Sequence, residues 1–173
     1  QHHSHTNDPI KDPDYSTKAK NFKNAIWINF FVNTSGNNIY KDFVENLEDS
    51  QENKRTIFES LLTNISYWTI LIIFVWLGFG LEVACIWWIP RLIALGYVRM
   101  TLSWAPHHPM EEQGRYRNTR GFKAKIGTIL TMGMEYHIIH HLHPSIPLNL
   151  NPAAYRALKP ILIKKNCRLD KNL

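Results

Sequence analysis

The sequence contains few sulfur ligands. Only two cysteines occur among its 173 residues, Cys85 in a very apolar stretch and Cys167 near the end. Two cysteines in such different surroundings exclude a disulfide-stapled scaffold and a thiolate metal site. The HExxH signature of zinc proteases and the Glu-x-x-His pair of soluble di-iron bundles are also absent. The 45% hydrophobic content excludes a disordered chain.

Positive charge is concentrated in one part of the chain. The formal charge is +6, yet residues 1–60 carry 7 Lys/Arg against 9 Asp/Glu, whereas residues 105–173 carry 11 against 4. Nucleic-acid binders combine basic residues with exposed aromatic side chains on a soluble surface. Here four of the six tryptophans lie in the most hydrophobic part of the chain: Trp68, Trp76, Trp87 and Trp88. This pattern favours lipid as the partner and argues against nucleic acid.

Two apolar stretches are long enough to cross a membrane. Residues 60–81 contain no charge and would form a helix of about 33 Å, against a hydrocarbon core of about 30 Å. Residues 83–104 are equally long but contain Pro90, Arg91 and Arg99, so we expect a kink and charged groups that face a partner, water or the interface. The alternative is a buried helix of a large soluble protein, which rarely stays apolar on every face.

The short connection between these stretches predicts a transmembrane hairpin. Its turn at residues 78–82 contains no Lys or Arg, so the positive-inside rule places residues 1–60 and 105–173 in the cytoplasm. The shorter apolar patch at residues 25–32 cannot span a bilayer and predicts an interfacial or re-entrant helix, or a soluble core helix. The expected fold is an all-α membrane protein, a transmembrane helical hairpin with a cytoplasmic, helical, histidine-rich cap.

All nine histidines fall into three short windows on the side that this topology makes cytoplasmic. Metal binding is the simplest shared cause. On a helix, His137, His140 and His141 would share one face at spacings i, i+3 and i+4, and Pro144 would end that helix. The three windows are His2, His3 and His5; His107 and His108; and His137, His140, His141 and His143.

The ligand type restricts the metal. Imidazole without thiolate suits iron, zinc, copper or nickel, and the number of histidines exceeds the four-coordinate shell of one zinc ion. Two metals are therefore expected. A histidine-rich di-iron site at a membrane surface fits this ligand set.

The histidine windows also resemble a known family. QHHSHTNDPIKDPDY, then a hydrophobic hairpin, then APHHPMEEQGRYRN and EYHIIHHLHPSIP are similar to the histidine boxes of the membrane fatty acid desaturase/hydroxylase superfamily. Within it, the beta-carotene hydroxylase branch is the most similar. The likeness covers nearly the whole chain in the right order, so we expect residues 1–173 to form a single desaturase-like domain.

The resemblance implies which side chains bind metal. The final histidine pair of the second box corresponds to His2 and His3, and His107 corresponds to the additional histidine outside the boxes. The expected ligands are His2, His3, His107, His137, His140 and His141. Possible second-shell residues are His5, Asp8, His108 and His143. Asp8, Asp12 and Asp14 adjoin proline turns, where carboxylates cap backbone N–H groups, so they are expected in second-shell or structural roles.

The resemblance further implies that a first box and an N-terminal transmembrane pair precede this sequence. Gln1 is not an initiator residue, so we expect the chain to be part of a larger, four-helix membrane domain and to be inactive alone. About three ligands would lie upstream.

The activity implied by the resemblance is O2-dependent oxidation of a lipid C–H bond. Two iron ions and electrons from an external donor such as a ferredoxin would drive it. Hydroxylation of a carotenoid ring and desaturation of an acyl chain both remain open. The basic segment with Arg115, Arg117 and Arg120 is expected either to bind anionic headgroups or an acidic electron donor, or to have no specific role. The alternative is a non-catalytic membrane metal-binding or transport module, which predicts ionisable residues along the spanning segments.

Overall fold

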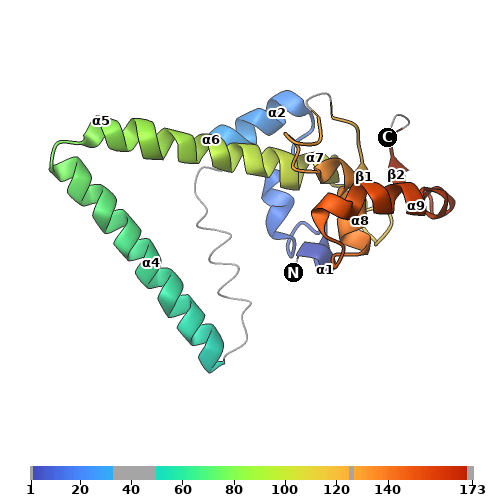
Figure 1. Cartoon of the computed structure of the whole chain (residues 1–173), viewed down its shortest axis with the longest axis horizontal. Helices are drawn as coiled ribbons and strands as arrows, with labels where there is room; N and C mark the ends of the chain where they lie inside the picture. Colours follow the sequence, from blue (N-terminus) through green and yellow to red (C-terminus); the bar gives the residue numbers. More distant parts are fainter. Residues whose placement is uncertain (1, 33–49, 125–126, 171–173) are drawn as a thin grey trace. The chain divides into compact units, whose positions relative to one another are not determined.

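The computed structural model describes residues 2–32, 50–124 and 127–170, most of them in helices (Figure 1). The chain divides into two compact units. We call residues 1–33 with 96–173 the histidine unit, and residues 34–95 the hairpin unit. The expected all-α class is confirmed, with one small addition. Strands β1 (Arg120–Gly121) and β2 (Arg168–Leu169) form a parallel ladder that pairs Arg120 with Arg168.

The first apolar helix, α4, runs from Gln51 to Trp76. It begins nine residues before the expected span because the side chain of Ser50 caps it by accepting a hydrogen bond from the Asn53 N–H. The helix ends where Gly78 adopts a positive φ of 96°, a conformation that suits glycine. The polar start of α4 and its apolar remainder thus form one continuous helix.

The second apolar helix runs without a break from Gly80 to His107. It contains ordinary α-helical segments separated by two wider π-helical segments, and it extends beyond the expected span at both ends. The segment η3 ends two residues before Pro90, and such wide turns accommodate a missing or displaced backbone hydrogen bond. The segments are α5 (Gly80–Glu82), η3 (Val83–Trp88), α6 (Ile89–Val98), η4 (Arg99–Trp104) and α7 (Ala105–His107). Both long helices are long and apolar enough to cross a membrane.

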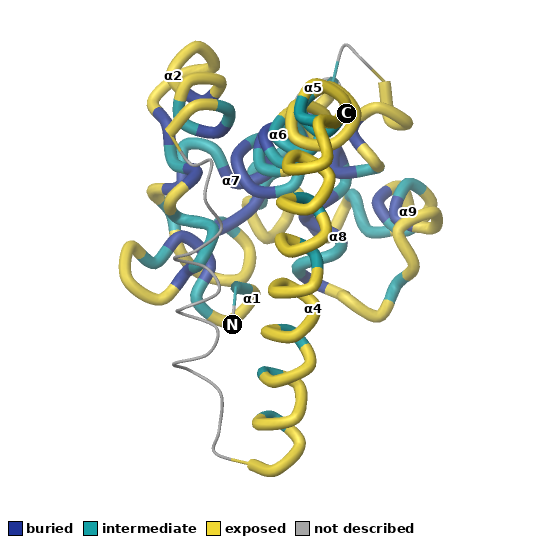
Figure 2. Tube along the Cα trace, turned by 90° about the vertical axis from the view of Figure 1, so that its left-hand side faces the viewer, coloured by how far each residue is buried: buried dark blue, intermediate teal, exposed yellow. Residues whose placement is uncertain are grey.

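Within the hairpin unit, aromatic side chains join the two helices. The indole N–H of Trp87 donates a hydrogen bond to the Tyr67 hydroxyl, and the rings of Trp68 and Trp88 lie 5.6 Å apart. The guanidinium of Arg91 lies 5.5 Å from the centre of the Trp88 ring, so this cation has an aromatic partner. None of the residues of α4, all of which are described, is buried, and Figure 2 shows most of this helix as exposed.

The first core of the histidine unit holds α8 (His137–Leu142) against α9 (Asn151–Lys164). It is small and wholly apolar apart from a tyrosine hydroxyl, and it lies behind the histidine face of α8. The 3-10 turns η5 (Met134–Tyr136) and η6 (Leu148–Leu150) precede the two helices. The buried side chains are Ile138, Ile139, Leu142, Tyr155 and Leu162.

The second core of this unit packs α2 (Phe22–Trp27) and the π-helical η2 (Ile28–Val32) on the end of the second apolar helix. Ala25 is buried with Met100 and Trp104. The helix expected over residues 25–32 is therefore present, with Trp27 and Phe31 on its exposed side. Its interfacial location stays a prediction.

Candidate metal centre

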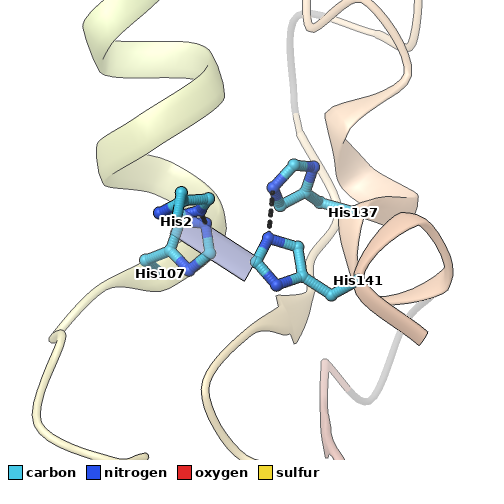
Figure 3. A group of neighbouring side chains, drawn as sticks. All are labelled: His2, His107, His137 and His141. Carbon is cyan, nitrogen blue, oxygen red and sulfur yellow. Dashed lines mark hydrogen bonds between the residues drawn. The ribbon is translucent and has the colours of Figure 1, made fainter. Parts of the chain in front are cut away.

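Four imidazoles from distant parts of the sequence converge within the histidine unit. One ring nitrogen from each of His2, His107, His137 and His141 lies within 4.8 Å of the others (Figure 3). They come from three short helices: α1 (His2–His5), α7 and α8. A group at this spacing could hold a metal ion after small side-chain shifts, because metal–imidazole bonds of about 2 Å bring two ligand nitrogens to within about 4 Å of each other.

Helix α8 presents two of its three histidines as a pair. His137 and His141 stand one turn apart, and their Nε2 atoms are separated by 3.1 Å. Ile138 and Ile139 point to the opposite side, where they are completely buried against α9. The alternation of histidine and isoleucine in HIIHH thus fixes which face of α8 carries the imidazoles, as the sequence spacing indicates.

His2 and His107 form the second pair, with Nε2 atoms 3.2 Å apart. The outer nitrogen of each ring is held by an acceptor. His2 Nδ1 lies 2.7 Å from a carboxylate oxygen of Asp12, and His107 Nδ1 lies 3.0 Å from the carbonyl oxygen of Asn118. An acceptor on Nδ1 places a proton there and leaves the Nε2 lone pair directed inwards, which is the usual arrangement behind a metal-binding histidine.

His3 and His140 lie beside these four rings. Their ring centres are 4.8 Å apart, His3 lies 4.3 Å from His141, and His140 lies 5.3 Å from His137. All six histidines expected as ligands are therefore neighbours in one group. The geometry brings together residues that are more than 130 positions apart in the sequence.

The other expected residues lie at the edge of this group or outside it. His5 lines a polar cleft of about 430 Å³ that also borders His3 and His141. His108 packs on the Trp104 ring, with ring centres 4.8 Å apart. His143 is exposed, and its backbone N–H bonds to Ile139 O at the end of α8.

Of the three aspartates, Asp12 alone is buried. One carboxylate oxygen meets His2, and the other accepts a hydrogen bond from the Asn7 N–H at 2.6 Å. Asp14 lies further off, 3.7 Å from His2 Nδ1. Asp8 is only half-buried and accepts hydrogen bonds from the N–H groups of Ile10 and Lys11, so it caps a turn.

Sequence reasoning did not find Asn7 and Asn118. Asn118 orients His107 through its main-chain carbonyl oxygen, which every residue type has, so the sequence could not single it out. Asn7 is recognisable as the first residue of an Asn-Asp-Pro turn, and such turns favour a positive φ, here 66°. Its side chain, however, bonds to residues over one hundred positions away, and the local pattern does not encode that contact.

Burial shapes the protonation of the site. Desolvation, with the neighbouring His107 ring as a second cause, holds the pKa of His137 well below its ordinary value. Desolvation also lowers the pKa of His141, His3 and His140. For His2, burial opposes the charged form, but the hydrogen bond with Asp12 and the negative charges of Asp14 and Asp12 together outweigh it and raise the pKa. Most of the rings are therefore held in the neutral form, the form that binds metal.

Two further observations fit a metal ion at this position. The Nδ1 protons of His2 and His107 are engaged by acceptors, so the two Nε2 lone pairs face each other across 3.2 Å. A cation or an added proton between them would relieve the repulsion between these lone pairs. The Nδ1 atom of His137 is buried and has no hydrogen-bond partner among the described residues. A ligand set made only of imidazoles suits iron as well as zinc, copper or nickel.

Comparison with known proteins places this geometry in a family. No curated protein and no solved structure matched the chain. A sequence model of the family described as fatty acid desaturase matches residues 1–171, which takes in all three histidine windows and both apolar helices. The chain therefore belongs to the fatty acid desaturase family.

Proposed function

We propose that this chain carries most of the di-iron site of a membrane enzyme that oxidises a C–H bond of a lipid. The family implies a membrane oxidoreductase that acts on lipids. The observation that supports the site is the convergence of His2, His107, His137 and His141 within 4.8 Å, with His3 and His140 beside them. Two irons are proposed because six imidazoles on one octahedral ion would leave no open position for O2.

The protein's contribution to the reaction is to hold and orient. The Nε2 atoms of His2 and His107 and the side chains of His137 and His141 would bind metal, with Asp12 and the Asn118 carbonyl fixing two of the rings. When bound, iron would supply the O2-dependent oxidation of an unactivated C–H bond. Burial lowers the pKa of His137 and His141 and so keeps these two imidazoles neutral, the form that binds metal.

The overall chemistry requires an external reductant. Desaturation takes two hydrogens from neighbouring carbons, consumes O2, two electrons and two protons, and releases two waters. Hydroxylation inserts one oxygen atom, consumes the same electrons and protons, and releases one water. We propose a small electron-transfer protein such as a ferredoxin as the donor, docking on the basic surface of residues 105–173, where Arg115, Arg117 and Arg120 lie.

For the substrate, carotenoid ring hydroxylation is the first candidate. It is supported by the stretches HH-x-H-x-NDP-x-x-DPD and YH-x-x-HH-x-x-PSIP, which resemble the beta-carotene hydroxylase branch. Acyl-chain desaturation is the second candidate, and the family match favours it. We also propose that residues 1–60 and 105–173 face the cytoplasm, because the turn of the hairpin lacks Lys and Arg.

The test is expression of the protein, with any sequence that naturally precedes His2, in cells that accumulate beta-carotene and ordinary membrane lipids. Mass spectrometry of the extracted lipids distinguishes the gain of an oxygen atom from the loss of two hydrogens. The purified protein should contain about two irons per chain. Stoichiometric zinc, or a complete lack of bound metal, would rule out the di-iron proposal. A protein that binds metal and leaves both lipid classes unchanged would favour the metal-binding or transport module.

A further inference from the structure

A continuous hydrogen-bond network links the outer nitrogens of His2 and His107, and Asn7 is at its centre. The backbone N–H of Asn7 donates to Asp12 Oδ2 at 2.6 Å, while Asp12 Oδ1 meets His2 Nδ1 at 2.7 Å. The side-chain amide of Asn7 donates to the carbonyl oxygen of Asn118 at 2.9 Å. The same carbonyl oxygen is the acceptor for His107 Nδ1 at 3.0 Å.

Asn7 therefore contacts both groups that orient the rings of the His2–His107 pair. Its amide nitrogen also donates to the carbonyl oxygen of Glu112 at 2.6 Å, so the loop between residues 112 and 118 is held at two points. The residue is buried, with an exposed fraction of 3%. A hydrogen bond in such a dry setting is stronger than one at the surface and is costly to leave unmade.

The backbone of Asn7 also explains why this residue type stands here. Its φ of 66° lies in the left-handed region, which asparagine and glycine adopt more readily than other residues. Glycine would fit the turn and keep the N–H bond to Asp12, yet it has no amide to reach Asn118. Asparagine alone combines a tolerance for this turn with a donor long enough to bond two carbonyl groups.

We propose that Asn7 is a positioning residue of the metal site, which sets the relative orientation of His2 and His107 by tying Asp12 to the carbonyl of Asn118. The proposal rests on the proposed function in that these histidines bind metal. Asn7 itself does not bind the metal. Its effect would pass through the two acceptors, and supporting groups of this kind typically change metal affinity by about 10- to 100-fold.

The decisive variant is Asn7→Gly, because it removes the side-chain bonds and keeps the left-handed backbone. Asn166→Gly is the matched control: Asn166 also has a positive φ, 55°, but it is exposed and follows α9, outside the histidine cluster. Asn7→Asp is the second variant, since it keeps the shape of the side chain while losing the amide donor. All three are made in the intact, membrane-inserted protein.

The readout is cobalt(II) binding to the purified, metal-depleted proteins, followed by its visible absorption spectrum, because neither measurement requires turnover. We expect Asn7→Gly to weaken cobalt affinity about 10- to 100-fold and to alter the spectrum, with an unchanged circular dichroism spectrum. Asn7→Asp should show the same defect, and Asn166→Gly should match the parent protein.

Unchanged cobalt affinity and spectrum in a folded Asn7→Gly variant would overturn the positioning role and leave the proposed function intact. A defect of equal size in Asn166→Gly would also overturn it, because the effect would then be general. A parent protein that binds cobalt tightly but oxidises no lipid would refute the proposed function alone. A parent protein that fails to bind cobalt would refute both.

Discussion

The two units of this protein differ in which groups they expose and which they bury. In the hairpin unit, α4 exposes large apolar side chains from Phe58 to its end, and none of its residues is buried. In the histidine unit, polar groups such as His107, Asn7 and Asp12 are buried. A water-soluble protein would not expose apolar side chains on this scale, because such surface costs free energy in water, whereas buried polar groups are tolerated where they are hydrogen-bonded.

The difference separates two roles. The exposed apolar helix needs a surrounding solvent of hydrocarbon, and its residue types matter chiefly through their hydrophobicity. The buried polar network of the histidine unit needs defined partners at defined distances, and there each residue type matters individually. Substitutions in the two units should therefore obey different rules.

The largest effect is expected from the loss of a buried histidine at the centre of the metal site. His137→Ala removes an imidazole whose Nε2 lies 3.1 Å from that of His141 and leaves a gap in the ligand set. We expect metal binding to weaken and lipid oxidation to fall by at least about 100-fold, more than loss of a supporting residue typically costs. Iron analysis and product formation measure this.

His143→Ala is the matched control for that variant, since His143 belongs to the same HIIHHLH segment but is exposed. It should retain full iron content. Equal losses in the two variants would mean that the cluster tolerates no histidine change anywhere, and the distinction between inner and outer histidines would be wrong.

The next effect contrasts two exposed isoleucines on helices of the two units. Ile72 on α4 and Ile163 on α9 are exposed to 65% and 62%, so accessibility alone predicts equal tolerance of lysine. If α4 spans the membrane, Ile72→Lys should oppose insertion by about 2.5–3.5 kcal/mol. Ile163→Lys, beside Lys159 and Lys164, should change stability by less than about 0.5 kcal/mol.

A membrane-insertion assay with glycosylation sites on both flanks of the hairpin gives this comparison directly. Normal insertion of the Ile72→Lys variant would show that α4 is not surrounded by lipid. Failure of both variants would place α9 in the hydrocarbon as well.

A smaller effect is expected at two glycines of the second apolar helix. A Cβ atom at Gly96 would lie 2.4 Å from a ring carbon of Phe30, whereas at Gly80 the nearest atom would be 3.9 Å away. Gly96→Ala should destabilise the packing of η2 by about 1–3 kcal/mol. Gly80→Ala should be neutral or stabilising by up to about 1 kcal/mol, because alanine favours helix. Thermal unfolding in detergent distinguishes them, and the reverse order would contradict the Phe30 contact.

The smallest effect concerns a turn at the surface of the histidine unit. Hydrogen bonds from the N–H groups of Ile10 and Lys11 lower the pKa of Asp8 below its ordinary value. A lowered pKa means that the carboxylate stabilises the fold at pH values above its unfolded pKa, and that this contribution is lost as the pH falls through the lower, folded pKa.

We therefore expect Asp8→Asn to lower the unfolding temperature slightly at pH 7 and to leave it almost unchanged at pH 2, which flattens the fall between about pH 5 and pH 2. Scanning calorimetry over that range measures it. A large loss at pH 7 would show that Asp8 has a role at the site, as a second-shell residue would.

Much of this organisation could be predicted from the sequence, for reasons that differ from residue to residue. The charge-free run at residues 60–81 and the i, i+3, i+4 spacing of the histidines at 137–141 can both be recognised within a short stretch of sequence. Both correspond to helices in the structure. The family resemblance supplied the grouping of His2 and His107 with α8, and the structure shows these residues together.

The support of the site could not be predicted in the same way. Asn118 acts through its carbonyl oxygen, and any residue has one. Helix α4 starts at Gln51 because Ser50 caps it there. Hydropathy marks only the point, near residue 60, where the charged residues stop, so it could not locate this start. The turn residue Asn7 is visible locally, but its bond to Asn118 arises from tertiary folding that no spacing rule contains.

The π-helical segment η4 (Arg99–Trp104) makes the length of the second apolar helix as important as its composition. Each wide turn adds a residue without advancing the helix by an ordinary step, and one residue of an α-helix corresponds to about 100° of rotation. The added residue therefore sets the direction in which His107 points from the helix axis, and that direction is toward the other histidines. A deletion of a single residue in this segment would therefore turn His107 away from its three partners.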